Sequence, residues 1–316
     1  MASGHISNLL SSSLLIKSVM VPILVTVMSL SFPVSAQKML TDPSSFSPED
    51  DDPQRTEPVG PLNLIDNIYS VSAVVHYPSF LITTPEGHFL IDTSLEEFVP
   101  GIVRNIEALG FDPEDVKYLL THHAHVDHVG GHAMMQEITG ATTIALGEDA
   151  HVMESGGRTD FREREPWTPA RVDRIIQDLD QLQLGDTVLT AHHTPGHSKG
   201  CTTWAMQVEE NGRPLDVVFF CGLRMNPEEA LIGNPDYPNM AEEFAYAFAK
   251  LKALPVDVFL ASHGYWFNFN EKYQLKLQNP EVNPFIDPES YHWIVDGFER
   301  AYIQRLRQER GITTAR

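Results

Sequence analysis

The hydrophobic pattern from residue 68 onward predicts an α/β protein. Apolar side chains alternate or run together in three segments, a spacing typical of strands: 68–76 (IYSVSAVVH), 79–85 (SFLITTP) and 87–93 (GHFLIDT). Residues 96–110 instead space their apolar positions along one face of a helix and end on a glycine. A short buried strand is then expected at 115–120.

The second half of the chain resembles the first. A strand leads into 189–200, a helix is expected at 240–254, and a further strand at 256–264 contains His263 near its end. Residues 289–310 have the spacing of a terminal amphipathic helix. Its apolar side chains are expected to face the core: Trp293, Ile294, Phe298 and Ile303.

A β-hairpin is predicted where Asn211-Gly212 separates the apolar stretches 201–210 and 213–222. Folding about that turn places Cys201 and Cys221 nearly opposite each other. Two interpretations stay open at this point, a cross-strand disulfide and a pair of buried free thiols, because disulfide geometry is demanding.

The N-terminal part of the chain differs from the rest. Residues 1–36 carry Lys17 as their only formal charge, followed by the apolar run 19–32 and a small-residue cleavage site ending at Ala36. This pattern predicts a secretory signal peptide, hence a periplasmic or secreted protein; an uncleaved anchor is the alternative. Residues 37–59, rich in Pro, Ser and acid, are expected to form a flexible linker before a domain at 60–316.

Composition narrows the classes of partner. The chain has 316 residues, 42% of them hydrophobic, enough for a sizeable core. A formal net charge of -21 argues against nucleic acid and, once the signal is removed, against an anionic membrane surface, since both attract basic proteins. Nothing in the sequence demands a protein partner.

The stretch THHAHVDHVGG at 121–131 is the main candidate for chemistry. Along a loop, alternate residues point the same way, so His123, His125 and Asp127 can converge while His128 turns to a neighbouring point. His197 and His263 follow predicted strands elsewhere. Imidazole and carboxylate are zinc ligands, and catalytic zinc uses three of them.

These six residues divide into two sets of three, which suggests a dinuclear hydrolytic site with ions about 3.5–4 Å apart. The remaining histidines near these motifs are interpreted as solvated, core or neighbouring side chains: His122, His151, His192, His193 and His292.

At this point the residues resemble a known family. HAHVDH at 123–128, HTPGH at 193–197 and the late His263 are similar to the metallo-β-lactamase superfamily. The stretches at 80–93, 193–204, 234–238 and 254–263 resemble its subclass B3 in particular.

The resemblance implies an αββα sandwich of two mixed β-sheets flanked by helices, with a site at one edge that binds two Zn²⁺ ions. By motif, His123, His125 and His197 would hold the first ion. The second would be held by Asp127, His128 and His263. It also implies β-lactam hydrolysis, and thus antibiotic resistance, by a metal-bound hydroxide that Asp127 orients as the catalytic residue.

The sequence departs from this family pattern at FFCGLRMNP, residues 219–227. Subclass B3 enzymes usually have small hydroxyl residues here, which help to hold the substrate carboxylate; Gly222 and Arg224 take those positions. Arg224 would suit a carboxylate, and Lys199 could also reach an anionic substrate. A solvated surface role is the alternative for both cations.

Other functions remain open. A lactonase, another ester, thioester or phosphodiester hydrolase, or an iron-dependent sulfur dioxygenase would use the same scaffold. These relatives normally carry a metal-bridging aspartate near position 222, where this chain has glycine. A non-catalytic zinc protein is the third alternative, which the complete ligand set disfavours.

Overall fold

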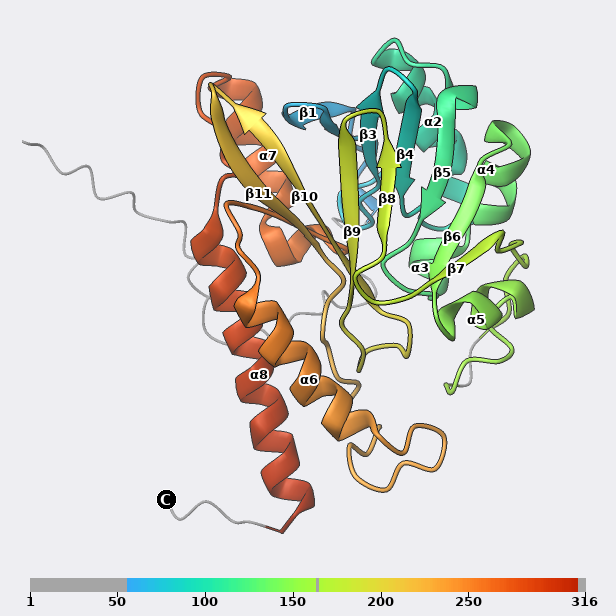
Figure 1. The fold of residues 1–316 in the computed structure, drawn as a ribbon, viewed down its shortest axis with the longest axis vertical. Helices are drawn as coiled ribbons and strands as arrows, with labels where there is room; N and C mark the ends of the chain where they lie inside the picture. The colour runs from blue at the N-terminus through green and yellow to red at the C-terminus, as the bar shows by residue number, and fades with distance from the viewer. Residues whose placement is uncertain (1–55, 163–164, 312–316) are drawn as a thin grey trace, which may run out of the picture.

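Two β-sheets face each other and are covered on their outer sides by helices, as Figure 1 shows. The computed structural model describes residues 56–162 and 165–311. This arrangement confirms the predicted αββα sandwich. The predicted signal peptide 1–36 and most of the linker, residues 37–55, lie outside the described residues, so both stay predictions.

The first sheet contains seven strands in the order of the sequence, β1 to β7. Strands β1 to β4 are antiparallel, and β4 to β7 are parallel. The strands are β1 (Leu62–Ile65), β2 (Ile68–Ser70), β3 (Phe80–Thr84), β4 (Gly87–Ile91), β5 (Val116–Leu120), β6 (Thr142–Leu146) and β7 (Arg174–Ile176).

The second sheet contains five strands in the order β12-β11-β10-β9-β8. Only the β11–β12 pair is parallel. The strands are β8 (Gln181–Leu184), β9 (Thr187–His193), β10 (Thr202–Glu210), β11 (Arg213–Phe220) and β12 (Val258–Ala261). The β10–β11 hairpin turns at Asn211 and Gly212, which both have positive φ, as predicted for this dipeptide.

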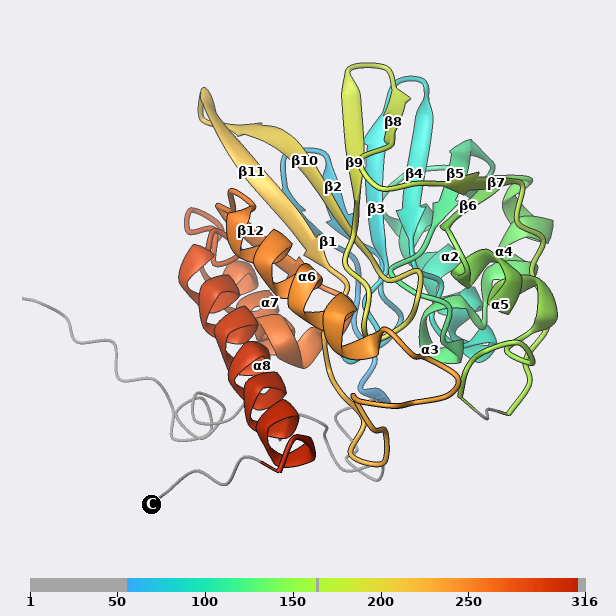
Figure 2. The same ribbon diagram turned by 60° about the horizontal axis from the view of Figure 1, so that its bottom comes forward.

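Helices cover the outer faces of both sheets, and Figure 2 shows α6, α7 and α8 grouped beside β11 and β12. Their bounds are α2 (Val99–Ala108), α3 (Val126–Val129), α4 (His132–Thr139), α5 (Asp149–Ser155), α6 (Met240–Ala253), α7 (Phe269–Gln278) and α8 (Pro288–Glu309). Short 3₁₀ turns occupy Glu96–Phe98, Pro113–Asp115 and Gly264–Phe267. Within the described part of the chain, no helix is both long and apolar enough to span a membrane.

Alternation along the strands separates two apolar layers. In β3 and β4, Leu81 and Leu90 pack with α2, whereas Phe80, Phe89 and Ile91 belong to the core shared with the second sheet. Successive strand residues point to opposite faces, so the parts of these strands that are buried on both sides, 80–82 and 89–91, are apolar at every position. This explains why their pattern is a continuous run.

Two expectations were wrong, one about the length of a strand and one about the burial of a side chain. The strand expected at 68–76 ends at Ser70, because a side-chain hydroxyl there takes the place of a backbone carbonyl as hydrogen-bond acceptor. Ser72 Oγ accepts from the Ser79 N–H at 3.0 Å and lies 2.8 Å from Ser70 Oγ. In α8, Ile294 and Phe298 are buried as expected, but Ile303 is 37% exposed.

Candidate metal centre

The histidine-rich loop follows the carboxyl end of β5 and is fixed between the two sheets. Trp204 of β10 donates from Nε1 to the Thr121 carbonyl at 3.0 Å. The backbone then turns into α3, with the N–H groups of His128 and Val129 both 2.9 Å from the His125 carbonyl. The loop therefore presents its side chains from a rigid backbone.

A first cluster contains His123 and His125 from this loop and His197 from the loop after β9. Their candidate ligand atoms lie within 4.8 Å of one another, and all three side chains are buried. The three ring centroids are 4.4–4.8 Å apart. Nδ1 of His197 lies 2.8 Å from the Arg224 carbonyl and donates to it, which orients the ring.

A second cluster contains Asp127, His128 and His263. Oδ2 of Asp127 lies 3.6 Å from Nε2 of His128 and 3.8 Å from Nε2 of His263. The Asp127 side chain is 27% exposed, so the cluster opens to solvent on that side. The rings of His123 and His128 are only 4.1 Å apart, which places the two clusters next to each other. The structure thus brings together all six predicted residues, in the two predicted sets.

Asp92 connects the second cluster to the protein interior, and sequence reasoning missed it. Its Oδ2 accepts from Nδ1 of both His122 (2.8 Å) and His128 (2.7 Å), and its Oδ1 accepts from the His122 N–H at 2.8 Å. Burial by itself would raise the pKa of Asp92, but charge and hydrogen bonds from His122 and His128 hold it far below its usual range. Its position at the end of a buried strand is the signal that could have identified it.

Asp149, at the start of α5, joins the two loops of the first cluster and was also missed. It accepts from Ala124 N–H (2.9 Å), Ser198 Oγ (2.8 Å) and Gly200 N–H (2.7 Å). Burial raises the pKa of Asp149 to about 6, against the opposite effect of these donors. Nothing in the sequence around Asp149 indicated this role.

The donor set fits divalent zinc. Burial and the surrounding imidazoles hold the pKa of His123 and of His263 well below the usual value, so both are neutral near pH 7. Nε2 of His123 is buried and has no hydrogen-bond partner among the described residues. Neutral imidazoles next to a carboxylate are the ligands that zinc prefers.

Gly222 lies where Trp266 leaves no room for a side chain. A Cβ there would be 2.1 Å from Cζ3 of Trp266, and Gly222 has a φ of +102°. The same indole packs against the His263 ring at a centroid distance of 4.6 Å. Trp266 and the positive φ therefore leave no room for the hydroxyl residue expected at position 222.

Replacing Gly222 with alanine should lower the free energy of unfolding by about 2–4 kcal/mol, because overpacking adds to backbone strain. Urea unfolding followed by fluorescence measures the difference. Gly110→Ala is the matched control, since Gly110 also has a positive φ (+86°) but no heavy atom within 4 Å of the added Cβ. Equal losses in the two variants would show that Trp266 does not limit this position.

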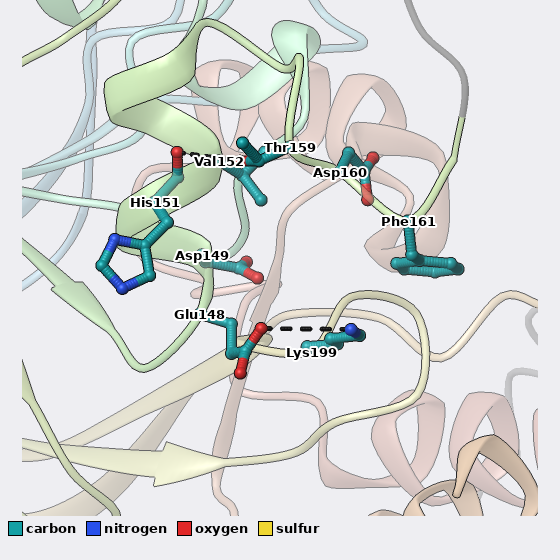
Figure 3. A pocket seen from close by; sticks show the side chains of 8 residues that line it. All are labelled: Glu148, Asp149, His151, Val152, Thr159, Asp160, Phe161 and Lys199. Carbon is teal, nitrogen blue, oxygen red and sulfur yellow. Dashed lines mark hydrogen bonds and ion pairs between the residues drawn. The ribbon is translucent and has the colours of Figure 1, made fainter. Parts of the chain in front are cut away.

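The two predicted substrate-binding cations lie in different surroundings. Arg224 is half-buried, and its charge contributes to the lowered pKa of His263, so it lies near the second cluster. Lys199 lines a cavity of about 230 Å³ beside the first cluster, where its Nζ is 3.9 Å from Glu148 Oε2 (Figure 3). The Arg224 backbone carbonyl also binds His197, whereas Lys199 is paired with Glu148, so Arg224 is the better candidate for reaching a ligand at the metal centre.

Cys201 and Cys221 form a disulfide, which decides between the two interpretations left open by the sequence. Their Cα atoms are 6.0 Å apart, just beyond the paired ends of β10 and β11. Both cysteines are fully buried. Sγ of Cys221 lies 3.6 Å from Nδ1 of His123, so the disulfide packs directly behind the first cluster.

Comparison with known protein sequences identifies the superfamily and several hydrolases. The family model of the Metallo-beta-lactamase superfamily matches residues 74–263. The N-acyl homoserine lactonase AttM of Agrobacterium fabrum is 32% identical over 165 residues, which cover 44% of this chain and 62% of the relative. The lactonase AiiA of Bacillus thuringiensis subsp. kurstaki is 26% identical over 159 residues, covering 43% and 60%. The matches therefore span less than two thirds of these relatives.

Comparison with solved structures gives more extensive matches. The native FEZ-1 metallo-beta-lactamase from Legionella gormanii has 35% identity and a TM-score of 0.78, covering 81% of this chain and 98% of that one. The subclass B3 enzyme BJP-1 of Bradyrhizobium japonicum has 34% identity and a TM-score of 0.75, covering 82% and 98%. The class B3 di-zinc enzyme LRA-12, from an Alaskan soil metagenome, has 31% identity and a TM-score of 0.75, covering 82% and 99%.

Proposed function

The chain belongs to the metallo-beta-lactamase superfamily, and we propose that it hydrolyses the amide bond of β-lactams with two bound zinc ions. One observation carries the proposal: two adjacent clusters, each of three side chains that can bind zinc, follow the ends of β5, β9 and β12. The match to subclass B3 enzymes, which extends over nearly the whole of their chains, supports the choice of reaction.

We assign the first ion to His123, His125 and His197. The second is assigned to Asp127, His128 and His263. The di-zinc relative LRA-12 supports two ions. Bound zinc would supply a water molecule whose pKa is lowered to about 7 and a Lewis acid for the substrate carbonyl. The side chains of the protein would orient the attacking water and bind the substrate.

Asp127 is the residue that we expect to act on the attacking water. It is the carboxylate of the two clusters, and its side chain is 27% exposed, on the side from which a substrate would approach. A carboxylate there can accept a hydrogen bond from the water and orient it toward the carbonyl carbon. It can also take the proton that the water loses.

We propose that Arg224 binds the carboxylate that β-lactam antibiotics carry next to the scissile amide. A guanidinium offers a planar pair of donors that matches a carboxylate, so it can replace the missing hydroxyl at this edge. Gly222 then serves to admit Trp266 rather than to donate a hydrogen bond. Lys199 would have to leave Glu148 to reach the same group.

Lactone hydrolysis is the second candidate, favoured by the curated relatives. AttM and AiiA are N-acyl homoserine lactonases. Against it, the aspartate that such relatives normally carry near position 222 is replaced by Gly222, beside which Trp266 fills the space. Both reactions open a cyclic acyl group by attack of water, so substrate testing has to separate them.

The test is a hydrolysis panel on purified, zinc-loaded protein. A penicillin, a cephalosporin, a carbapenem and an N-acyl homoserine lactone are each assayed with and without a chelator. We expect β-lactam turnover that stops on chelation and returns when zinc is added back. Lactone turnover without β-lactam turnover would replace the proposal by the second candidate, and turnover that chelation leaves unchanged would contradict both.

We also propose that the mature protein works outside the bacterial cytoplasm, in the periplasm or beyond. The N-terminal 36 residues support export, and the Cys201–Cys221 disulfide supports an oxidising compartment. Edman sequencing of protein secreted by an expressing bacterium would identify the first residue, expected to be Gln37.

A further inference from the structure

Arg162 lies at the edge of the first cluster and is nearly buried, with 9% of its side chain exposed. Its Nη1 donates to the His197 carbonyl at 2.6 Å and lies 3.2 Å from Nε2 of His125. One guanidinium therefore contacts two candidate ligands that come from different loops and different sheets. The proposed function assigns no role to this residue.

Glu229 holds Arg162 in place. The Glu229 carboxylate pairs with Nε of Arg162 through one oxygen and accepts from its Nη2 at 2.7 Å through the other, so the two groups form a bidentate pair. Only 16% of the Glu229 side chain is exposed. Asn226 Nδ2 donates to the same carboxylate at 3.0 Å. A planar two-point pair of this kind fixes direction as well as charge.

The loop that carries Glu229 is in turn fixed by the C-terminal helix α8. Arg305 donates from Nη2 to the carbonyls of Pro227 (2.8 Å) and Glu229 (3.0 Å). Glu309 accepts from the Leu231 N–H at 3.1 Å and pairs with Arg305 at 2.8 Å. A continuous chain of polar contacts thus runs from α8 to the His197 backbone.

We propose that Arg162 is a positioning residue of the first cluster, held by Glu229, and that this pair connects the first ion's affinity to α8. This inference rests on the proposed binding of zinc by His123, His125 and His197. The pairing is needed for two reasons. Nη1 of Arg162 contacts both His197 and His125, while its Nε and Nη2 are held by Glu229, so the two loops keep a set separation. Glu229 also neutralises a cation that would otherwise repel an ion beside it.

The test measures metal binding directly on the full mature chain, without substrate. Zinc affinities are determined by competition with a chromophoric chelator, and the first site is monitored by the visible spectrum of the cobalt-substituted protein. We expect Arg162→Gln and Glu229→Gln each to weaken the first ion's binding by about 10- to 100-fold and to change the cobalt spectrum. Arg162→Lys, which keeps the charge but not the fork, should fall between them and the natural chain.

Arg171→Gln is the matched control, because Arg171 pairs with Asp173 through the same two nitrogens but is 69% exposed. Its other hydrogen-bond partner is Gln136, and neither partner is a candidate ligand. This variant should leave both affinities and the spectrum unchanged. The double variant Arg162→Gln/Glu229→Gln should lose less than the sum of the single changes, because neither charge is then left alone.

The proposal would be overturned by an Arg162→Gln variant that is folded, with the urea midpoint of the unsubstituted protein, and that keeps the same zinc affinity and cobalt spectrum. Should Arg162→Gln fail to fold, Arg305→Gln, which contacts neither cluster, provides the decision: weaker first-site binding supports the connection, and unchanged binding refutes it. Protein that binds two zinc ions without hydrolysing β-lactams would contradict the proposed function alone and leave this inference standing.

Discussion

Asp127→Asn should lower kcat for β-lactam hydrolysis by about 10²- to 10⁴-fold, the contribution typical of a positioned proton acceptor. Asparagine has the same shape, and its carbonyl oxygen can still face His128 and His263. It carries no negative charge, however, and cannot take a proton from water. The loss should therefore appear mainly in kcat, with the second zinc ion bound more weakly than in the natural chain.

Steady-state kinetics at saturating zinc, together with zinc titration of the apo-protein, separate these two effects. Asp115→Asn provides the control, since Asp115 is 60% exposed and forms an ion pair with Lys117, which is not a candidate ligand. If Asp127→Asn keeps the natural kcat, Asp127 neither orients nor deprotonates the attacking water, and the assignment of the catalytic residue is wrong.

Asp92→Asn should weaken binding of the second zinc ion by about 10- to 100-fold, since partners that orient a ligand have effects of this size. The amide can replace one carboxylate oxygen but turns an N–H₂ group toward ring nitrogens that themselves donate. Leaving buried donors unpaired should also lower the free energy of unfolding of the apo-protein by about 1–3 kcal/mol.

The stability effect of Asp92 should depend on pH. Because the folded-state pKa of Asp92 is lowered, its contribution is fully present above the ordinary carboxyl pKa and is lost as the pH falls toward the lowered value. The difference between the natural chain and Asp92→Asn should thus be largest near pH 7 and shrink below about pH 4. Urea unfolding of the metal-free proteins at several pH values measures this, and a difference that grows on acidification would contradict the role of the His122 and His128 contacts.

The sequence predicted the elements whose signals are local. The hairpin was predictable because Asn211-Gly212 needs positive φ at both residues, and the six clustered residues were predictable because they follow strand ends. Asp149 and Arg162 were not, since each acts through partners at least 25 residues away in the chain. Asp92 had the signal of a strand end, but its partner His128 lies 36 residues away and apolar periodicity does not pair them. The early end of β2 depends on a hydroxyl contact across a loop, which apolar periodicity does not detect.

The first cluster joins the two halves of the sandwich, and this has a consequence for folding. His123 and His125 follow β5 of one sheet, whereas His197 follows β9 of the other, 72 residues later than His125. An ion held there acts as a reversible cross-link that closes a long loop and binds only the assembled protein. By mass action it would add about 4 kcal/mol of stability at a free concentration 1,000-fold above its Kd. Metal supply would then govern how long each molecule survives proteolysis as well as how fast it works.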